Sequence, residues 1–257
     1  MSDSSRKSIE LLQAAVEAGD AAAMNKLGTY YYHGIEGIPQ DGKKAFELYQ
    51  RAAELGNADA VNNLGLCYRN GKGVPANDKK SAEFCQRAAD MGCVDAIYWL
   101  GRYYHTGTGV KKDALKAIKL YQRAVEKGNS SAMYMLGVCY HSGAGVKKSL
   151  KKAVELYQRS VDLGNADAMY ALARCYSIGE GVRTDDKKSL ELSKRAALLG
   201  NPDAIYNIAA RHLRGVGVGQ DIEKAIFFFQ CAADLGSEEA VAALNTIGVP
   251  YTPKRTK

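Results

Sequence analysis

The chain has 257 residues, a formal net charge of +7 and a hydrophobic content of 46%, which is enough for a sizeable core. No run approaches the roughly 20 apolar residues that cross a bilayer, and the first seven residues lack the apolar stretch of a signal peptide, so we expect neither a membrane span nor export. The basic charge attracts acidic proteins, nucleic acids and anionic lipids alike and therefore selects no partner.

A glycine recurs along the chain with a step of 37 residues once and of 36 residues five times. A fixed period of this length indicates an array of small units that bury their apolar faces only by stacking on one another. The recurring glycines are Gly19, Gly56, Gly92, Gly128, Gly164, Gly200 and Gly236.

The residues after each of these glycines predict a first helix. Asparagine follows the glycine at Asn57, Asn129, Asn165 and Asn201 and is a preferred N-cap residue. Within the helix, residues such as Val61, Leu64, Gly65 and Tyr68 lie at i, i+3, i+4 and i+7 and form one apolar stripe. We expect the small third residue to allow close approach of a neighbouring backbone.

A second helix follows a tight turn made by paired glycines such as Gly71 and Gly73. Good N-cap residues begin it in all six units, and alanine-rich pairs near its end permit close packing. Each unit is therefore predicted to be a helical hairpin. The predicted N-caps are Asp41, Asn77, Asp113, Ser149, Asp185 and Asp221.

These patterns predict one solenoid domain over residues 8–249, with a capping helix at 8–19 and another at 237–247. Residues 1–7 and the basic tail 250–257 are predicted to be flexible. The six predicted repeats span 20–56, 57–92, 93–128, 129–164, 165–200 and 201–236.

The six cysteines form no C-x-x-C pair and do not occur in pairs within each repeat. Three of them, Cys67, Cys139 and Cys175, occupy the same position just before a tyrosine, where a small buried side chain fits. We interpret the cysteines as reduced thiols in a cytoplasmic protein, with no metal site and no cofactor.

The recurring pattern A-x-x-x-L-G-x-x-Y-x-x-G-x-G-V, followed by a cap, K-A and a closing A-A-x-x-G, resembles the Sel-one-like repeat (SLR), a relative of the tetratricopeptide repeat. Residues 41–68 and 113–140 match it nearly throughout. The resemblance implies a noncatalytic scaffold or adaptor that binds proteins or peptides. We predict an all-α, right-handed superhelical α-solenoid.

In tetratricopeptide arrays the first helices line the concave side, and this geometry is carried over here as an analogy. The position two before the conserved leucine holds Asn25, Asn62, Tyr98, Tyr134, Tyr170 and Tyr206. Nearby positions on the same helices add the basic residues Arg69, Arg102, His105, His141 and Arg174.

This predicted partner-binding face suits an extended peptide. Amides hold backbone groups, tyrosines supply stiff contact area, and Arg102 and Arg174 can form bidentate bonds to acidic or C-terminal carboxylates. The alternative is that the four tyrosines only pack between neighbouring first helices. Asn62 is harder to explain by packing alone, because a buried amide needs partners.

The second helices carry rows of basic residues that a single-stranded RNA binder would also need. We favour a structural role, because lysine and arginine stems cover apolar surface and neighbouring glutamates supply opposite charges. RNA binding stays open as the alternative to protein binding. The rows are Lys44, Lys80, Lys116, Lys152, Lys188 and Lys224, and Arg51, Arg87, Arg123, Arg159 and Arg195, with Glu47, Glu83, Glu155 and Glu191 nearby.

Catalysis has less support. Ser149 and Lys152 spell the S-x-x-K of serine-acylating enzymes, but Ser149 lies at a predicted helix cap and neither K-T-G nor S-D-N accompanies it. His105 and His141 are equivalent residues of adjacent units, but no nearby carboxylate or thiol completes a metal set. We expect no enzymatic activity, and a hydrolase is kept as the second alternative.

Overall fold

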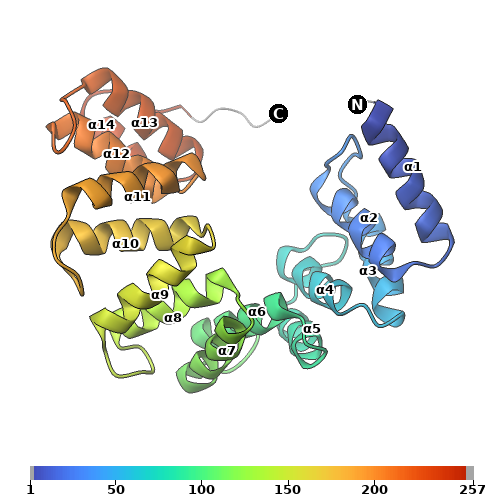
Figure 1. Ribbon diagram of the computed structural model, residues 1–257. Helices are drawn as coiled ribbons and strands as arrows, with labels where there is room; N and C mark the ends of the chain where they lie inside the picture. Colours follow the sequence, from blue (N-terminus) through green and yellow to red (C-terminus); the bar gives the residue numbers. More distant parts are fainter. Residues whose placement is uncertain (1–2, 253–257) are drawn as a thin grey trace. The chain divides into compact units, whose positions relative to one another are not determined.

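The computed structural model describes the backbone of residues 3–252 and the side chains of residues 7–252. This part of the chain is all-helical and contains 14 helices (Figure 1). The chain divides into two compact units, residues 1–129 and 130–257. Within residues 3–252, none of the helices combines the length and the apolar character needed to cross a bilayer.

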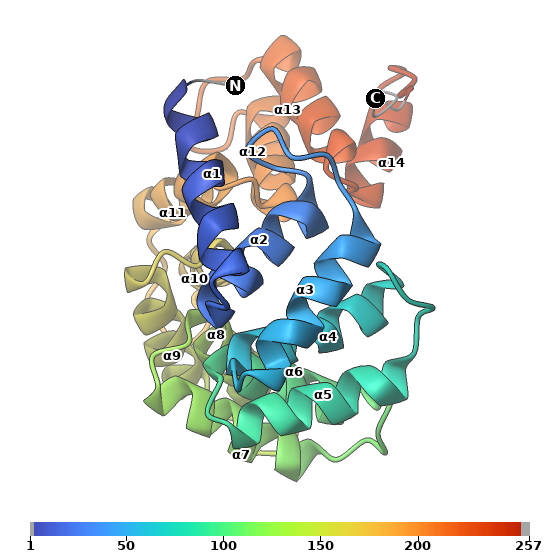
Figure 2. The same ribbon diagram turned by 90° about the vertical axis from the view of Figure 1, so that its right-hand side faces the viewer.

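Unit 1 contains the first seven helices. Its helices are α1 (Asp3–Glu17), α2 (Ala21–His33), α3 (Gly42–Glu54), α4 (Ala58–Asn70), α5 (Asp78–Asp90), α6 (Val94–Thr106) and α7 (Ala114–Glu126). Figure 2 shows α2 to α5 as neighbours in sequence order: α2 pairs with α3, α3 packs on α4, and α4 pairs with α5. These are stacked helix-turn-helix pairs, as the period predicts.

Unit 2 has the same organisation and ends in a single shorter helix. Its helices are α8 (Ser130–Ser142), α9 (Leu150–Asp162), α10 (Ala166–Ile178), α11 (Asp186–Leu198), α12 (Pro202–Arg214), α13 (Ile222–Asp234) and α14 (Glu238–Thr246). The repeat is confirmed in both units, whereas the handedness of the solenoid stays a prediction.

The helix ends form as the sequence predicts. The recurring glycines all adopt left-handed backbone conformations, with φ between +80° and +93°, which terminate one helix before the next begins. Side chains of Asn57, Asn165 and Asn201 accept hydrogen bonds from backbone N–H groups of the helices that they cap. All six predicted caps of the second helices do the same.

The glycine of the first-helix stripe makes room for a tyrosine ring from the second helix of the same repeat. A Cβ at Gly101 would lie 2.8 Å from the ring of Tyr121, and one at Gly137 would lie 2.6 Å from the ring of Tyr157. Backbone also comes close here, as we predicted, because a Cβ at Gly137 would lie 3.3 Å from the carbonyl oxygen of Ala153. The approach in the loops is closer still, since a Cβ at Gly73 would overlap the carbonyl of Gly42 in the preceding repeat.

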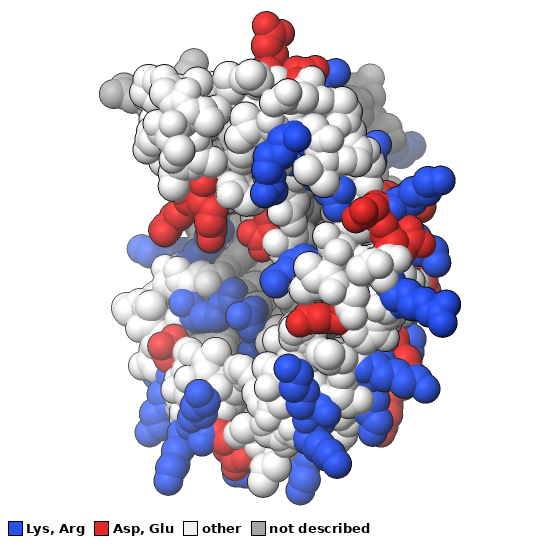
Figure 3. Space-filling model, turned by 90° about the vertical axis from the view of Figure 1, so that its left-hand side faces the viewer, with Lys and Arg blue, Asp and Glu red and all other residues white. Residues whose placement is uncertain are grey.

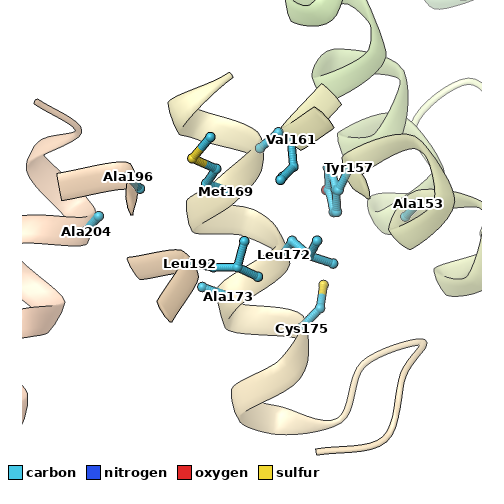
Figure 4. Packing of buried hydrophobic residues seen from close by; sticks show 11 residues of the cluster. Ala153, Tyr157, Val161, Met169, Leu172, Ala173, Cys175, Leu192, Ala196 and Ala204 are labelled. Atoms are coloured by element: carbon cyan, nitrogen blue, oxygen red, sulfur yellow. The ribbon is translucent and has the colours of Figure 1, made fainter. Parts of the chain in front are cut away.

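The core is a row of buried side chains between successive helices. In Figure 4, Tyr157 of α9 and Leu172 of α10 point toward one another, and Leu192 of α11 approaches α10 from the other side. The exposed fractions of these side chains are 3%, 0% and 7%. Burying a large apolar side chain contributes about 1.5–3 kcal/mol, so the stack depends on many such contacts between neighbours.

The ends of the solenoid differ in detail from the prediction. Helix α1 begins at Asp3 rather than at Ser8, and Asp3 is a residue type that favours a helix N-terminus. Near the other end, the hydroxyl of Tyr251 donates a hydrogen bond to Asp234 at 2.9 Å, and the ring packs against α12–α14. Tyr251 is therefore docked, although we assigned it to a flexible tail. Residues 1–2 and 253–257, where flexibility is also predicted, lie outside the described residues.

Candidate functional site

The predicted partner-binding residues all lie on first helices of the repeats and all keep some exposure to solvent. Ten of them are half-buried, and Arg174 is exposed. Unit 1 carries Asn25 on α2, Asn62 and Arg69 on α4, and Tyr98, Arg102 and His105 on α6; unit 2 carries Tyr134 and His141 on α8, Tyr170 and Arg174 on α10, and Tyr206 on α12.

The two predicted asparagines of unit 1 already have partners within the fold. The side-chain amide of Asn63 donates to Oδ1 of Asn25 at 2.8 Å, which links α4 to α2. Oδ1 of Asn62 lies 4.0 Å from Sγ of Cys85, which donates a weak hydrogen bond to it. Asn62 therefore has a structural contact in addition to its exposed surface.

Two of the three predicted basic residues of unit 1 converge on the single tryptophan of the chain. The guanidinium of Arg69 lies 4.0 Å from the ring centre of Trp99, and that of Arg102 lies 5.2 Å from it. Cation–π contacts of this kind hold the two guanidinium groups in place. Sequence analysis missed Trp99, although its position directly after Tyr98 was a usable signal.

His105 lies beside this cluster, with its ring 6.4 Å from that of Tyr121. Burial lowers the pKa of His105, and the positive charges of Lys112 and Arg102 lower it further. A lowered pKa favours the neutral imidazole at pH 7. His105 is therefore suited to packing and hydrogen bonding rather than to supplying charge.

In unit 2, four predicted residues line one cavity of about 210 Å³, which we call the histidine cavity. They are Tyr134, His141, Tyr170 and Arg174. Nε2 of His141 lies 2.7 Å from Oε2 of Glu180 and donates to it when the carboxylate is ionised. This hydrogen bond is the main reason that the pKa of Glu180 is below its usual value.

A second cavity of about 330 Å³ adjoins the first and shares Tyr170 and Arg174 with it. We call it the arginine cavity, because Arg211 and Arg214 of α12 also line it. Sequence analysis did not single out these two arginines. A signal was present, since Arg211 stands 36 residues after Cys175 at a position that is cysteine in three repeats.

Most of the predicted tyrosines pack against the second helix of their own repeat. The ring of Tyr98 lies 6.3 Å from Tyr121, and that of Tyr206 lies 5.3 Å from Phe229. We considered packing between neighbouring first helices. These rings pack on second helices instead, whereas Tyr170 is hydrogen-bonded to Asn207 of the neighbouring first helix α12. Tyr206 lines neither cavity, so the structure does not bring it together with the other candidates of unit 2.

The lysine row of the second helices contacts tyrosines of the first helices. Five of the six lysines lie over a tyrosine ring, with 5.1–5.3 Å between Nζ and the ring centre. Their acidic partners are cap aspartates such as Asp185, 3.8 Å from Lys188, and no described ion pair joins them to the glutamates that we expected. The pairs are Lys44–Tyr31, Lys80–Tyr68, Lys116–Tyr104, Lys152–Tyr140 and Lys188–Tyr176.

The remaining sequence candidates also have structural roles. Oγ of Ser149 accepts from the backbone N–H of Lys152 at the start of α9, as a cap does. Cys67, Cys139 and Cys175 are buried, and burial raises their pKa values to about 12, 11 and 11. A thiol with so high a pKa is a poor nucleophile at neutral pH.

Comparisons with known proteins agree with this architecture. A Sel1 repeat protein from Oxalobacter formigenes is 34% identical, with a TM-score of 0.77 over 88% of this chain and 99% of that chain. The protective antigen c5321 of uropathogenic Escherichia coli, which displays an SLR fold, is 33% identical, with a TM-score of 0.70. This match covers 93% of our chain but only 51% of c5321.

Immunity protein Pa5087 from Pseudomonas aeruginosa is more distant, at 26% identity and a TM-score of 0.57 over 76% of this chain and 74% of that one. A comparison with curated proteins gives no match. The family model described as Sel1 repeat matches six successive segments, 21–57, 58–93, 94–129, 130–165, 166–201 and 202–237. These segments cover most of the chain, which therefore belongs to the Sel1 repeat family.

Proposed function

We propose that this Sel1 repeat protein is a noncatalytic scaffold or adaptor that binds a protein or peptide through the first helices of its repeats. One observation carries the proposal: Tyr134, His141, Tyr170 and Arg174, chosen from their positions in the repeat, line the same cavity. Helices α8 and α10 supply all four. Such a site presents aromatic contact area next to hydrogen-bonding groups.

The chemistry of the histidine cavity suits an extended peptide that carries acidic groups. Tyr134 and Tyr170 are stiff side chains that lose little conformational entropy when a ligand binds. Arg174 is exposed and forms none of the described ion pairs, so its guanidinium has donors to offer a side-chain or C-terminal carboxylate. Glu180 disfavours a second acidic group near His141.

Two lines of support favour binding over catalysis. Ser149 is used as a helix cap, which removes the basis for the hydrolase alternative. The likeness to a protein described as an immunity protein also agrees with a binding role.

The cysteines bear on a separate question, the location of the protein. We also propose a cytoplasmic location, because five of the six cysteines are buried free thiols.

Peptide selection followed by affinity measurement tests the proposal. Short random peptides are selected on the immobilised protein, and the enriched peptides are titrated against variants by fluorescence polarisation. Arg174→Glu is expected to weaken binding about tenfold or more, because it reverses the charge at the cavity. Arg195→Glu is the matched control, since Arg195 is also exposed but lies on the second helix α11. Unchanged affinity in Arg174→Glu contradicts the assigned face.

An RNA-binding assay on the same protein tests the alternative function, binding of single-stranded RNA. The face in Figure 3 shows Lys and Arg side chains interspersed with Asp and Glu, and the lysines of five repeats are held over tyrosine rings. We therefore expect only weak binding to single-stranded RNA. Tight RNA binding that falls steeply with added salt in a gel-shift assay would replace the peptide proposal.

A further inference from the structure

The arginine cavity exists because the fifth repeat lacks a large side chain. At the position where other repeats place Tyr121, Tyr157 or Phe229 against the first helix, α11 has Ser193. Ser189, one turn earlier, replaces an alanine. Both serines are 2% exposed and line the cavity, whose volume is about 330 Å³.

Arg211 of α12 reaches into this space, although it is a charged residue with only 9% of its surface exposed. Its Nη2 donates to Oγ of Ser189 at 2.9 Å. Its Nη1 is buried and has no hydrogen-bond partner among the described residues. The glycine at 217 leaves room for it, since a Cβ there would lie 3.2 Å from Nη1. This buried guanidinium therefore has one nitrogen without an acceptor and takes part in none of the described ion pairs.

Two further arginines line the same cavity, Arg174 and Arg214. Nε of Arg214 donates to the carbonyl of Ala210 at 3.2 Å. No carboxylate lines the cavity, and none of the ion pairs within residues 7–252 involves any of the three arginines. Asp203 and Glu180 are close enough to interact electrostatically with Arg174, but neither lines the cavity. The cavity therefore gathers three arginines and no lining carboxylate.

A buried charge without a partner is costly, and the cost is removed when an anion accepts its hydrogen bonds. We propose that the arginine cavity binds a phosphate group. A phosphomonoester carries close to two negative charges at neutral pH and three acceptor oxygens, which matches several guanidinium donors. The missing acceptor of Arg211 Nη1 is then a phosphate oxygen.

The other polar groups around the cavity agree with this choice. Asn207 and Tyr170 line it and are hydrogen-bonded to one another, which places an amide and a phenol beside the arginines. A carboxylate carries half the charge of a phosphate dianion and leaves more of the positive charge uncompensated. Three arginines around one cavity therefore favour phosphate over carboxylate.

Calorimetric titration of the full chain with inorganic phosphate, at constant ionic strength and without other oxyanions, tests the site. The wild type is expected to bind phosphate and to melt at a higher temperature in its presence. Arg214→Gln, at an exposed edge of the cavity, is expected to bind phosphate up to about tenfold more weakly. Arg195→Gln is the matched control and is expected to keep wild-type affinity.

Arg211→Tyr is expected to abolish phosphate binding. If the Arg211→Tyr variant fails to fold, Arg214→Gln still tests the site. Three results would overturn the proposal: the wild type does not bind phosphate, Arg214→Gln and Arg195→Gln bind it equally well, or acetate binds more tightly than phosphate. Phosphate binding requires no protein partner, so its failure leaves the peptide experiment unaffected, and the reverse also holds.

Two probes distinguish the source of the phosphate. Tighter binding of a phosphoserine peptide than of inorganic phosphate, with loss in Arg214→Gln, supports the site and identifies a phosphorylated side chain as its ligand. Binding of inorganic phosphate as tight as or tighter than that of the peptide supports the site and identifies a free phosphate compound.

Discussion

The second and fifth repeats make the same departure from the other four, in the middle of the second helix. Ser81 and Cys85 on α5, and Ser189 and Ser193 on α11, occupy positions that are otherwise alanine and a large aromatic residue. The aromatic residue is needed to fill the space beside the first helix. The pairs of the other repeats are Ala45 and Tyr49, Ala117 and Tyr121, Ala153 and Tyr157, and Ala225 and Phe229.

The two repeats compensate with different residues from the next first helix. Tyr103 of α6 reaches Ser81, with 2.7 Å between the two hydroxyl oxygens, and is 4% exposed. Arg211 of α12, at the equivalent position, reaches Ser189 but leaves a guanidinium nitrogen without a partner among the described residues. Both repeats thus lack the aromatic ring of the second helix. In the second repeat a phenol occupies the space, and in the fifth repeat a guanidinium lies there beside a cavity. The first arrangement serves stability, and the second suits a ligand.

Truncating the two compensating residues should separate these roles most strongly. Tyr103→Ala is expected to lower the free energy of unfolding by about 3–5 kcal/mol, because it removes a buried ring and leaves a void. Arg211→Ala should cost less, since the packing that it loses is offset by removal of an uncompensated charge. Urea unfolding followed by circular dichroism measures both variants. Equal losses would show that Arg211 is as structural as Tyr103.

Giving the fifth repeat the tyrosine of the second should have a smaller effect on the free energy of unfolding than Tyr103→Ala, and of opposite sign. Arg211→Tyr is expected to raise the free energy of unfolding by on the order of 1 kcal/mol, because a phenol can reach Ser189 without burying a charge. The same urea unfolding experiment measures it. Arg214→Gln, at an exposed position, is the control and should stay within about 0.5 kcal/mol of the wild type. Destabilisation by Arg211→Tyr contradicts the equivalence of the two repeats.

The sequence was sufficient for the repeat architecture because its signals are local. A left-handed glycine, an asparagine cap and an i, i+3, i+4, i+7 stripe each involve residues within a few turns of one another. All six second-helix caps formed as predicted, from Asp41 to Asp221. The hydrogen bond of Tyr251 was missed because its acceptor, Asp234, is 17 residues earlier, on α13, and no local pattern links the two.

The candidate site was predictable only in part. Repeat position alone placed Tyr134, His141, Tyr170 and Arg174 on one face, and the structure brings them to one cavity. Repeat position did not reveal the contribution of Arg211, because that contribution depends on the neighbouring helix α11, which has Ser193 in place of a large aromatic residue. Comparison of equivalent positions would have flagged Ser193, which stands alone as serine among tyrosine, cysteine and phenylalanine.

Removing a single hydroxyl group gives the smallest and most specific test of the comparison. The hydroxyl of Ser81 donates to the carbonyl of Gly65 at 2.7 Å, so the hydroxyl of Tyr103 must be the donor in the bond between the two side chains. Tyr103→Phe leaves Ser81 bonded to Gly65 and is expected to cost about 0.5–1.5 kcal/mol in urea unfolding.

A double-mutant cycle with Ser81→Ala isolates this bond from the packing of the ring. In the Ser81→Ala background, Tyr103→Phe should cost less than in the wild type, because the phenol has lost the Ser81 hydroxyl and keeps only the weak contact with Cys85. An additive cycle would mean that Tyr103 compensates for the missing aromatic ring by volume alone.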